Sequence, residues 1–204
     1  MTEFEDFEKF LPQYLNPEDK EELFRNLSEW PDNIDGRLYT TRLLGEETVY
    51  QGDGLQDLLM VSLPDVTPWP APCMVLSNTC DTSPSNSRRV PKRACYAPIL
   101  DLAKFERGLR RENTLEDGIA VSAQIEIIRT QKVTNLFYLP NGQGLDYEAV
   151  VLLDTIMNCP PQDLYAGDLR ARRLFTLSDY GFYLLLFKLS VHFSRQREEV
   201  SRGG

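Results

Sequence analysis

The segment from Gln51 to Leu102 places short apolar runs at regular intervals, with turn-forming or polar residues between them. Met74-Val75-Leu76 and Ala94 to Leu100 are the clearest of these runs. Each has the length of a strand rather than that of a typical helix. The spacing predicts successive strands of a small, strongly curved antiparallel β-barrel, and this constrains the fold more than any other feature of the chain.

Length and composition are those of an ordinary globular protein. The chain has 204 residues, with 42% hydrophobic and 26% charged side chains, which is enough for one sizeable domain or for a core with additions at both ends. The longest apolar stretch, 182–193, is interrupted by polar residues, and the acidic first ten residues lack the basic start of a secretory signal. We therefore expect a cytoplasmic protein that does not enter a membrane.

Two amphipathic helices are predicted in an acidic N-terminal extension, residues 1–36. Phe4, Phe7 and Phe10 recur at helical spacing among acidic residues. Asn16 and Pro17 have the residue types of an N-cap and a first helical position, so a second helix begins there.

Residues 37–177 are predicted to form the barrel. Strands over 48–50 and 58–63 flank a turn at Gly52-Asp53-Gly54. Four prolines between Pro64 and Pro72 predict an irregular loop, because proline removes a backbone donor.

The second half of the barrel contains an inserted helix near 101–112, where Leu102, Phe105 and Leu109 share helical spacing. Apolar residues alternate from Ile119 to Ile128, which predicts a strand. The runs 133–139 and 147–154 predict a hairpin. Residues 174–177 predict one more short strand, and residues 178–204 a helix that begins after Ser178 and a flexible tail. The fold class is therefore α+β.

Metal and disulfide chemistry are not expected. The four cysteines form no CxxC pair, and His192 is the only histidine, so the usual zinc spacings are absent. A nucleophilic Cys80 would need His192 as its base, although a structural turn at Asn78 to Asp81 explains the same residues. We expect free thiols, no metal site and no cofactor.

The charge is concentrated at the N-terminus. Residues 1–50 carry 13 acids and 5 bases, whereas residues 51–204 carry 18 acids and 17 bases. Proteins that bind nucleic acid tightly present excess positive charge to phosphates. This balance disfavours RNA as a partner without removing a local basic patch.

Three motifs of the barrel segment resemble the MazF/PemK-like toxin barrel. They are the Gly52-Asp53 pair, the strand ending Val75-Leu76-Ser77-Asn78, and the strand ending Ala97-Pro98-Ile99, and the resemblance covers about residues 48–102. It implies a small SH3-like barrel and, in many members, cleavage of RNA. It also implies that such barrels often pair as homodimers.

The residues that the resemblance associates with cleavage are missing. An Arg-Pro pair is expected directly before the Val-Leu-Ser strand, and a Thr or Ser after the third strand. Ala71-Pro72 and Leu100-Asp101 stand at these positions. Metal-independent RNA cleavage needs a base, an acid and positive charge for the phosphate, so a cleavage site here would need cations from elsewhere.

The densest basic run, Ser87 to Arg93, is the alternative source of positive charge. Arg88, Arg89 and the nearby Asp81 are the candidate catalytic residues of a displaced site. The competing interpretation is a solvated loop, or one that docks an acidic surface through Arg88, Arg89, Lys92 and Arg93. A second basic cluster, 169–175, has two interpretations: a phosphate contact, or equally an edge strand whose charges block unwanted pairing.

Two functions therefore stay open from the sequence. The favoured one is a non-catalytic protein-binding or regulatory module derived from the toxin fold, in a toxin–antitoxin, antiviral-defence or transcription-control system. Its partner-binding residues are the basic ones of the 87–93 run together with Phe4, Phe7 and Phe10. The alternative is a metal-independent, sequence-selective endoribonuclease with a displaced active site.

Overall fold

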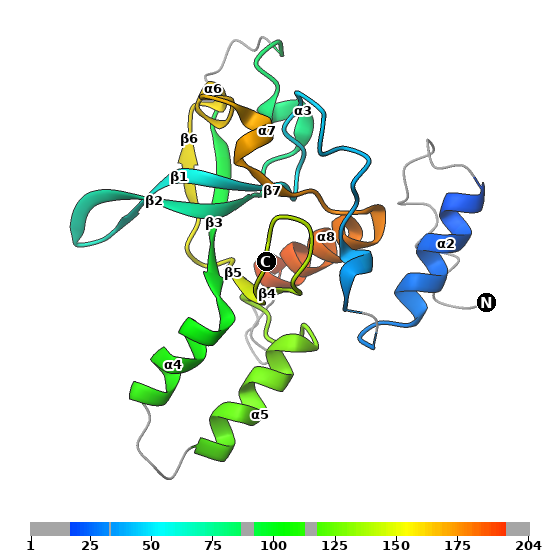
Figure 1. Cartoon of the computed structure of the whole chain (residues 1–204), viewed down its shortest axis with the longest axis vertical. Helices are drawn as coiled ribbons and strands as arrows, with labels where there is room; N and C mark the ends of the chain where they lie inside the picture. Colours follow the sequence, from blue (N-terminus) through cyan, green and yellow to red (C-terminus); the bar gives the residue numbers. More distant parts are fainter. Residues whose placement is uncertain (1–16, 33, 87–91, 113–117, 195–204) are drawn as a thin grey trace, which may run out of the picture.

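The protein has an α+β fold built on a curled antiparallel sheet, a half-barrel, with several helices around it (Figure 1). The computed structural model describes residues 17–32, 34–86, 92–112 and 118–194. The strands are β1 (Gly54–Ser62), β2 (Asp65–Val75), β3 (Ala94–Asp101), β4 (Leu136–Leu139), β5 (Ala149–Leu152), β6 (Met157–Cys159) and β7 (Arg173–Phe175). The helices are α2 (Pro17–Ser28), η2 (Gly36–Leu38), α3 (Thr79–Thr82), α4 (Leu102–Glu112), α5 (Gly118–Arg129), α6 (Pro161–Leu164), α7 (Leu169–Arg172) and α8 (Asp179–Ser194).

The sheet curls because β3 changes neighbours along its length. The strand order is β4-β5-β3-β2-β1-β7, with β6 paired to β3. The start of β3, Ala94 to Tyr96, pairs with β6, whereas its end, Ile99 to Asp101, pairs with β5. Register shifts interrupt the β1–β2 pairing, and such bulges increase local twist. These features bend the sheet into a half-barrel.

The main core lies between one face of the sheet and α8. Phe137, Phe175 and Leu185 are completely buried there. The opposite face has its own cluster, in which Cys73 and Val75 point away from Met74, as the alternation of a strand requires. Helix α8 contributes Tyr180, Tyr183, Leu184 and Leu185 to this core, so its first half is part of the core.

Ser178 fixes the start of α8. Its hydroxyl accepts a hydrogen bond from Gly181 N at 3.2 Å and donates one to Arg37 O at 2.6 Å. The first of these is an N-cap interaction. A Cβ on Gly181 would lie 2.3 Å from Leu38 O, so glycine allows the close approach of α8 to η2. The expected helix after Ser178 is confirmed.

Several predicted elements are confirmed. Strand β3 contains the whole run 94–100, β2 contains two of the three residues of 74–76, and β5 contains the central half of 147–154. β4 pairs antiparallel with β5 as a hairpin. Helices α2 and α4 begin close to Pro17 and Asp101 as expected. The helix predicted around Phe4, Phe7 and Phe10 lies outside the described residues.

The strand predicted over Ile119–Ile128 is wrong, because this segment is helix α5. The side chains buried against the neighbouring elements are Val121, Ile125 and Ile128, which recur every three or four residues, whereas Ile127 is exposed. The sequence fits alternation and helical spacing equally, and tertiary packing decides between them. Arg129 ties the helix to the hairpin by donating to both carboxylate oxygens of Glu148, at 2.9 and 2.7 Å.

The loop predicted for Pro64–Pro72 is also wrong. β2 starts at Asp65 and runs through Pro68, Pro70 and Pro72. Proline is compatible with a strand when its nitrogen faces away from the paired neighbour. The strand predicted over 48–50 is also wrong, because this segment is irregular. The edge-strand interpretation of 169–175 holds only in part, because the segment is the short helix α7 followed by the strand β7.

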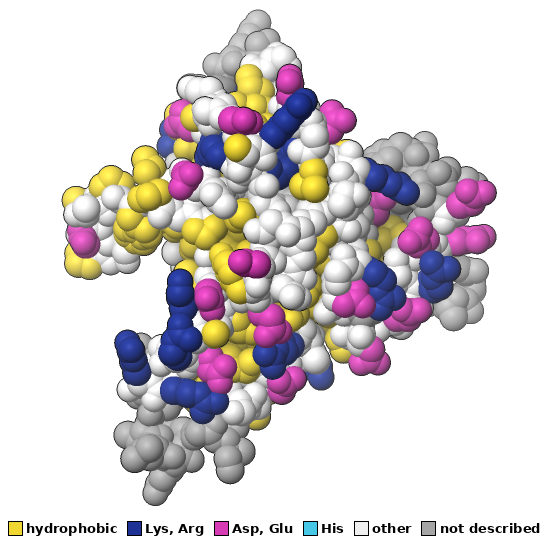
Figure 2. All heavy atoms as spheres, in the orientation of Figure 1, with side chains coloured by type: hydrophobic (Ala, Val, Ile, Leu, Met, Phe, Trp, Pro, Cys, Tyr) yellow, Lys and Arg dark blue, Asp and Glu magenta, His cyan; other side chains and the backbone are white. Residues whose placement is uncertain are grey.

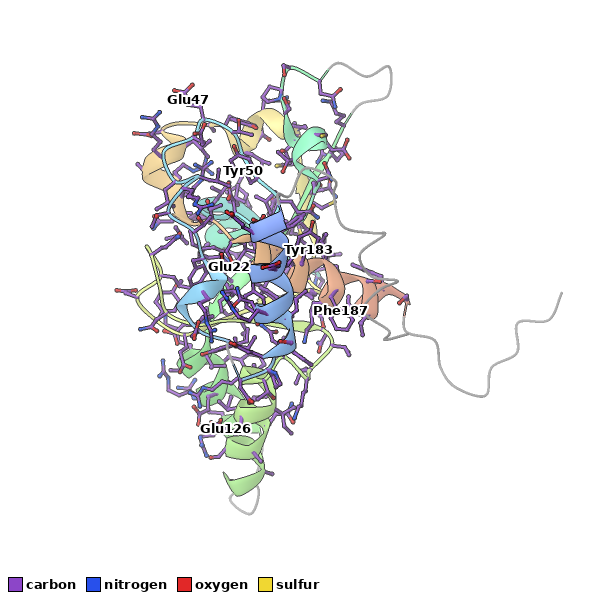
Figure 3. All side chains as sticks on the ribbon, turned by 90° about the vertical axis from the view of Figure 1, so that its right-hand side faces the viewer. Glu22, Glu47, Tyr50, Glu126, Tyr183 and Phe187 are labelled. Carbon is purple, nitrogen blue, oxygen red and sulfur yellow. The ribbon has the colours of Figure 1, made fainter. Side chains whose placement is uncertain are left out.

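The α4–α5 pair extends away from the sheet, with Glu126 on α5 at the opposite end of the molecule from Glu47 (Figure 3). None of the helices in the described ranges is long and apolar enough to cross a membrane.

Candidate protein-docking surface

The β1–β2 hairpin projects from the body of the protein as a two-stranded ribbon (Figure 1). β7 pairs with β1 at Gly54 and Leu55, and β3 pairs with β2 at Cys73 to Val75. No other described strand extends either pairing, so residues 58–71, which we call the ribbon, have no strand neighbour on either side. An isolated two-stranded hairpin is marginally stable in water. The ribbon therefore depends on contacts made at its base.

Those basal contacts are apolar and polar. Leu58 and Met60 are buried, and the Tyr96 hydroxyl donates to Leu59 O at 2.6 Å. Burial raises the pKa of Tyr96 to about 12, so its hydroxyl keeps the proton that this bond needs. The base of the ribbon is thus anchored to β3.

Beyond its base the ribbon exposes large apolar side chains to solvent. Leu59, Leu63, Val66 and Trp69 are 57%, 81%, 70% and 43% exposed. They account for half of the large exposed apolar residues in the described part of the chain. Figure 2 shows them as an apolar projection at the left of the molecule. Concentrated exposure of this kind marks interaction surfaces in soluble proteins.

The prolines of β2 determine how a partner can use the ribbon. Pro68, Pro70 and Pro72 occupy alternate positions, so their nitrogens face one edge of the strand. Because β1 occupies the other edge, this outer edge offers no N–H donor at three successive alternate positions. Addition of a partner strand along β2 is blocked. Side-chain contacts are the remaining mode of docking.

A groove of about 530 Å³ lies at the base of the ribbon. One wall consists of Gln56 and Asp57 from β1 and of residues 70–72 from β2. The other wall comes from the loop between β4 and β5 and from β7, and its residues are Gln143, Gly144, Asp146, Tyr147 and Leu174. The groove contains apolar surface and two aspartates, and none of the described residues that line it is basic.

The carboxylates of this groove are not neutralised by neighbours. Neither Asp57 nor Asp146 has a hydrogen bond or an ion pair to its carboxylate within the described residues. Burial raises the pKa of Tyr147, and the nearby Asp101 and Asp146 raise it further. The groove is therefore a region of negative potential beside apolar surface.

A buried ion pair holds the opposite end of the hairpin. Arg173 Nε lies 3.1 Å from Asp53 Oδ2, and both side chains are fully buried. Asp53 also accepts from Tyr50 N at 2.9 Å and from the Thr176 hydroxyl at 2.9 Å. Burial raises the pKa of Asp53 to about 6, against the opposing effect of these donors, so the carboxylate is ionised at neutral pH.

Arg173 also fastens the segment that precedes β1. Its guanidinium donates to the carbonyl oxygens of Leu43, Leu44, Glu46 and Thr48. The chain between η2 and β1 thus closes around one arginine. The sequence separation of 120 residues between Asp53 and Arg173 explains why sequence reasoning missed the pair.

The basic run predicted as a site is only partly described. Arg88 and Arg89 lie outside the described residues, as do Phe4, Phe7 and Phe10. Lys92 Nζ donates to Ser83 O at 3.0 Å, and Arg93 Nε donates to Asn158 Oδ1 at 2.7 Å. Lys92 therefore contacts the residue that follows α3, and Arg93 contacts β6.

The residues of the alternative nuclease site occupy separate places. Asp81 is half-buried in α3, and Asn78 caps that helix by accepting from Cys80 N at 2.9 Å. Ala71 and Pro72 line the groove, which holds no cation to stabilise a phosphate. Cys80 lies on α3 and His192 on α8, two elements on different sides of the sheet (Figure 1). Among the described residues no group of three His, Cys, Asp or Glu side chains is arranged to hold a metal ion.

Helix α4 carries a basic face that sequence reasoning missed. Lys104, Arg107, Arg110 and Arg111 are exposed, and Figure 2 shows Lys and Arg side chains gathered at the lower left, where α4 lies in Figure 1. Arg110 forms an ion pair with Glu106 at 2.5 Å. The signal was available, since Lys104, Arg107 and Arg111 recur at intervals of three and four residues.

Two further exposed aromatic residues lie on α8. Phe187 and Phe193 are 51% and 65% exposed, and Figure 3 shows Phe187 on this helix.

Comparisons with known proteins identify no relative of this chain. No family model matches it, and no curated protein matches it.

Proposed function

We propose that the chain is a non-catalytic protein-binding module built on a MazF/PemK-like, SH3-like barrel, acting in a toxin–antitoxin, antiviral-defence or transcription-control system. The observation that carries the proposal is the ribbon, whose large apolar side chains are exposed while its β2 edge is closed to strand addition. Exposed apolar side chains on a protruding element supply the buried anchors of an interface.

The acidic lining of the groove supports the same function. Under the resemblance, Ala71-Pro72 stands where an arginine would bind the scissile phosphate, and the groove around it contains carboxylates instead. Carboxylates repel a phosphate backbone. The proposed module therefore uses the former catalytic region for a partner other than RNA.

The test is capture of a partner from the native cell by the full chain and by matched variants. Leu63→Asp/Val66→Asp places charges at two ribbon positions that are solvent-exposed, so the fold is retained. Ile127→Asp makes the same kind of change on α5, at a residue 42% exposed. We expect one protein to be recovered with the wild type and with Ile127→Asp, and lost with the ribbon variant. Equal recovery with all three overturns the role of the ribbon.

A second docking surface in the proposal combines the basic 87–93 run with the N-terminal aromatic residues. Its test is Arg88→Glu/Arg89→Glu and, separately, Phe4→Ser/Phe7→Ser/Phe10→Ser, both in the full chain. A shortened chain that begins at Arg37 is unsuitable for this binding test. It would lack Leu23, which is 2% exposed and packs in the main core. Self-association, the remaining expectation, is measured by light scattering on the same proteins.

The alternative function is a metal-independent endoribonuclease. The basic face of α4 favours it, because three exposed cations on one face suit a phosphate backbone. Its test is incubation of RNA with the protein in chelator. Cleavage by the wild type that disappears in Asp81→Ala, Arg88→Ala or Arg89→Ala would establish it, and intact RNA supports the binding module.

A further inference from the structure

We propose that the groove at the base of the ribbon binds an extended segment of the protein partner in which a Lys or Arg is flanked by apolar residues. This inference rests on the proposed function and identifies the chemistry of its partner. It starts from the groove, whose volume of about 530 Å³ lies within the range of ligand-binding clefts.

Charge complementarity selects a basic partner. Asp57 and Asp146 stand on opposite walls of the groove, and neither carboxylate has an intramolecular cation among the described residues. The sequence contains no Lys or Arg between Arg42 and Arg88, so the ribbon and its wall of the groove carry no basic side chain. A cationic side chain placed between the two walls is attracted by both carboxylates. Electrostatic complementarity of this kind sets specificity and accelerates association.

Two residues of the groove, Asp57 and Gln143, have positive φ angles, which non-glycine residues seldom adopt. Asp57 has φ 60° and lies where the β1–β2 register shifts between Leu55 and Leu58. Bulges of this kind redirect a side chain out of the regular alternation. Across the groove Gln143 has φ 51°, and its Oε1 accepts from Thr176 N at 3.0 Å. Two of the described non-glycine residues with positive φ therefore line one groove, and the Gln143 wall is fixed to β7.

The apolar part of the site extends from the groove onto the ribbon. Pro70 and Pro72 line the groove, and Pro70 is directly opposite Leu59 in the β1–β2 register. Directly opposite residues project from the same face of a sheet. Since Leu59 is 57% exposed, a segment leaving the groove meets it next. Tyr147 adds an aromatic ring, a further favourable contact for a cation.

The first experiment selects peptides from a displayed random library on the immobilised full chain. Enriched sequences should contain Lys or Arg next to apolar residues. Enrichment of acidic sequences, or of no class, overturns the inference. The strongest enriched peptide is then synthesised with fluorescein and titrated by fluorescence anisotropy at several salt concentrations.

Matched variants locate the peptide. Asp57→Asn/Asp146→Asn removes both charges, and Asn adopts the positive φ of position 57 as readily as Asp. Glu21→Gln/Glu47→Gln removes two charges from exposed positions outside the groove. We expect the groove variant to bind about tenfold more weakly with a smaller salt dependence, and the control to bind like the wild type.

The outcomes separate this inference from the proposed function. If Leu63→Asp/Val66→Asp loses the cellular partner while Asp57→Asn/Asp146→Asn binds the peptide unchanged, the module stands and the basic segment is overturned. If both variants retain all binding, both proposals fail. If the groove variant instead abolishes self-association of the protein, the occupant is a second copy of the chain and the separate partner segment is overturned.

Discussion

The two ends of the β1–β2 hairpin are made from the same two strands and have opposite environments. At one end, Gly54 and Leu55 are buried between β7 and β2, beside the ion pair of Asp53 with Arg173. At the other end, Leu63 and Val66 project into solvent. One hairpin therefore serves both as a structural strand pair and as an exposed surface. Stability should therefore depend on one end, and partner binding on the other.

The largest expected effect on stability comes from breaking the buried ion pair. Arg173→Ala leaves the Asp53 carboxylate without its cation and the carbonyl oxygens of residues 43–48 without their donor. We expect the free energy of unfolding to fall by about 3–5 kcal/mol, measured by denaturant titration. Arg170→Ala is the control, because Arg170 is exposed and lies 3.7 Å from Glu47, so a loss below about 1 kcal/mol is expected. Similar losses in both variants would contradict the comparison.

The second effect concerns a buried cation that has no ion pair to a described residue. Lys188 on α8 is 4% exposed and donates to Gln131 O. Burial lowers its pKa to about 8. Below pH 8 the amine is charged in the folded and unfolded states and the cost of burial is complete; above about pH 10.4 it is neutral in both and the cost is gone.

The resulting prediction is a pH-dependent difference between Lys188→Met and the wild type. From pH 8 to about 10.4, the wild type should gain roughly 2–3 kcal/mol of unfolding free energy relative to the variant. Thermal or denaturant unfolding at each pH measures the difference, and comparison with the variant cancels the titration of tyrosines and cysteines. If the difference in unfolding free energy between wild type and variant stays constant over this pH range, burial of the charged Lys188 amine does not destabilise the protein as described.

A third, smaller effect separates two glycines. A Cβ on Gly54 would lie 2.4 Å from Phe175 Cε1, whereas a Cβ on Gly108 in α4 meets no atom within 4 Å. Gly54→Ala should destabilise the protein by about 1–3 kcal/mol because it overpacks the anchored end of the hairpin. Gly108→Ala should stabilise it by up to about 1 kcal/mol through helix propensity. Equal shifts in the denaturation midpoint would show that β1 and β7 approach less closely than described.

The smallest expected effect on stability belongs to the ribbon. Leu63→Asp/Val66→Asp changes two exposed side chains, so unfolding free energy should change by less than about 0.5 kcal/mol. The same variant should lose partner binding. A large loss of stability would instead mean that the ribbon tip packs against the protein in solution, and would end its assignment as a docking surface.

Part of the fold was predictable from local sequence. Runs such as Met74 to Leu76 and Ala94 to Leu100 are strands because they are short, apolar and bounded by turn residues. Segment 118–129 was not predictable, since its apolar residues fit both periods and only packing against β4 and β5 selects the helix. The prolines of β2 led to the wrong prediction of a loop over 64–72, because the sequence does not show which edge of a strand is paired.

The candidate site was less predictable than the fold. The reasoning from motifs selected charged residues near the expected catalytic positions, namely Asp81 and the 87–93 run. The ribbon, by contrast, is recognised by the solvent exposure of its apolar side chains. That exposure is set by which other elements of the fold pack against them. Leu63 and Val66 look like core residues in the sequence, and they are exposed because no other described strand or helix covers them.

Turns, caps and short apolar strands could be located from local sequence, because they depend on residues close together in the chain. The cap at Ser178 is one example. The turn before β1 is another, although it spans Tyr50 to Asp53 and Gly54 already belongs to the strand. Only the tertiary structure decided that Asp53 pairs with Arg173, that β1 and β2 extend beyond the sheet, and that Asp57 and Asp146 share a groove. These relations join residues far apart in the chain, and a local pattern carries no information about which distant group will neutralise a charge or cover an apolar face.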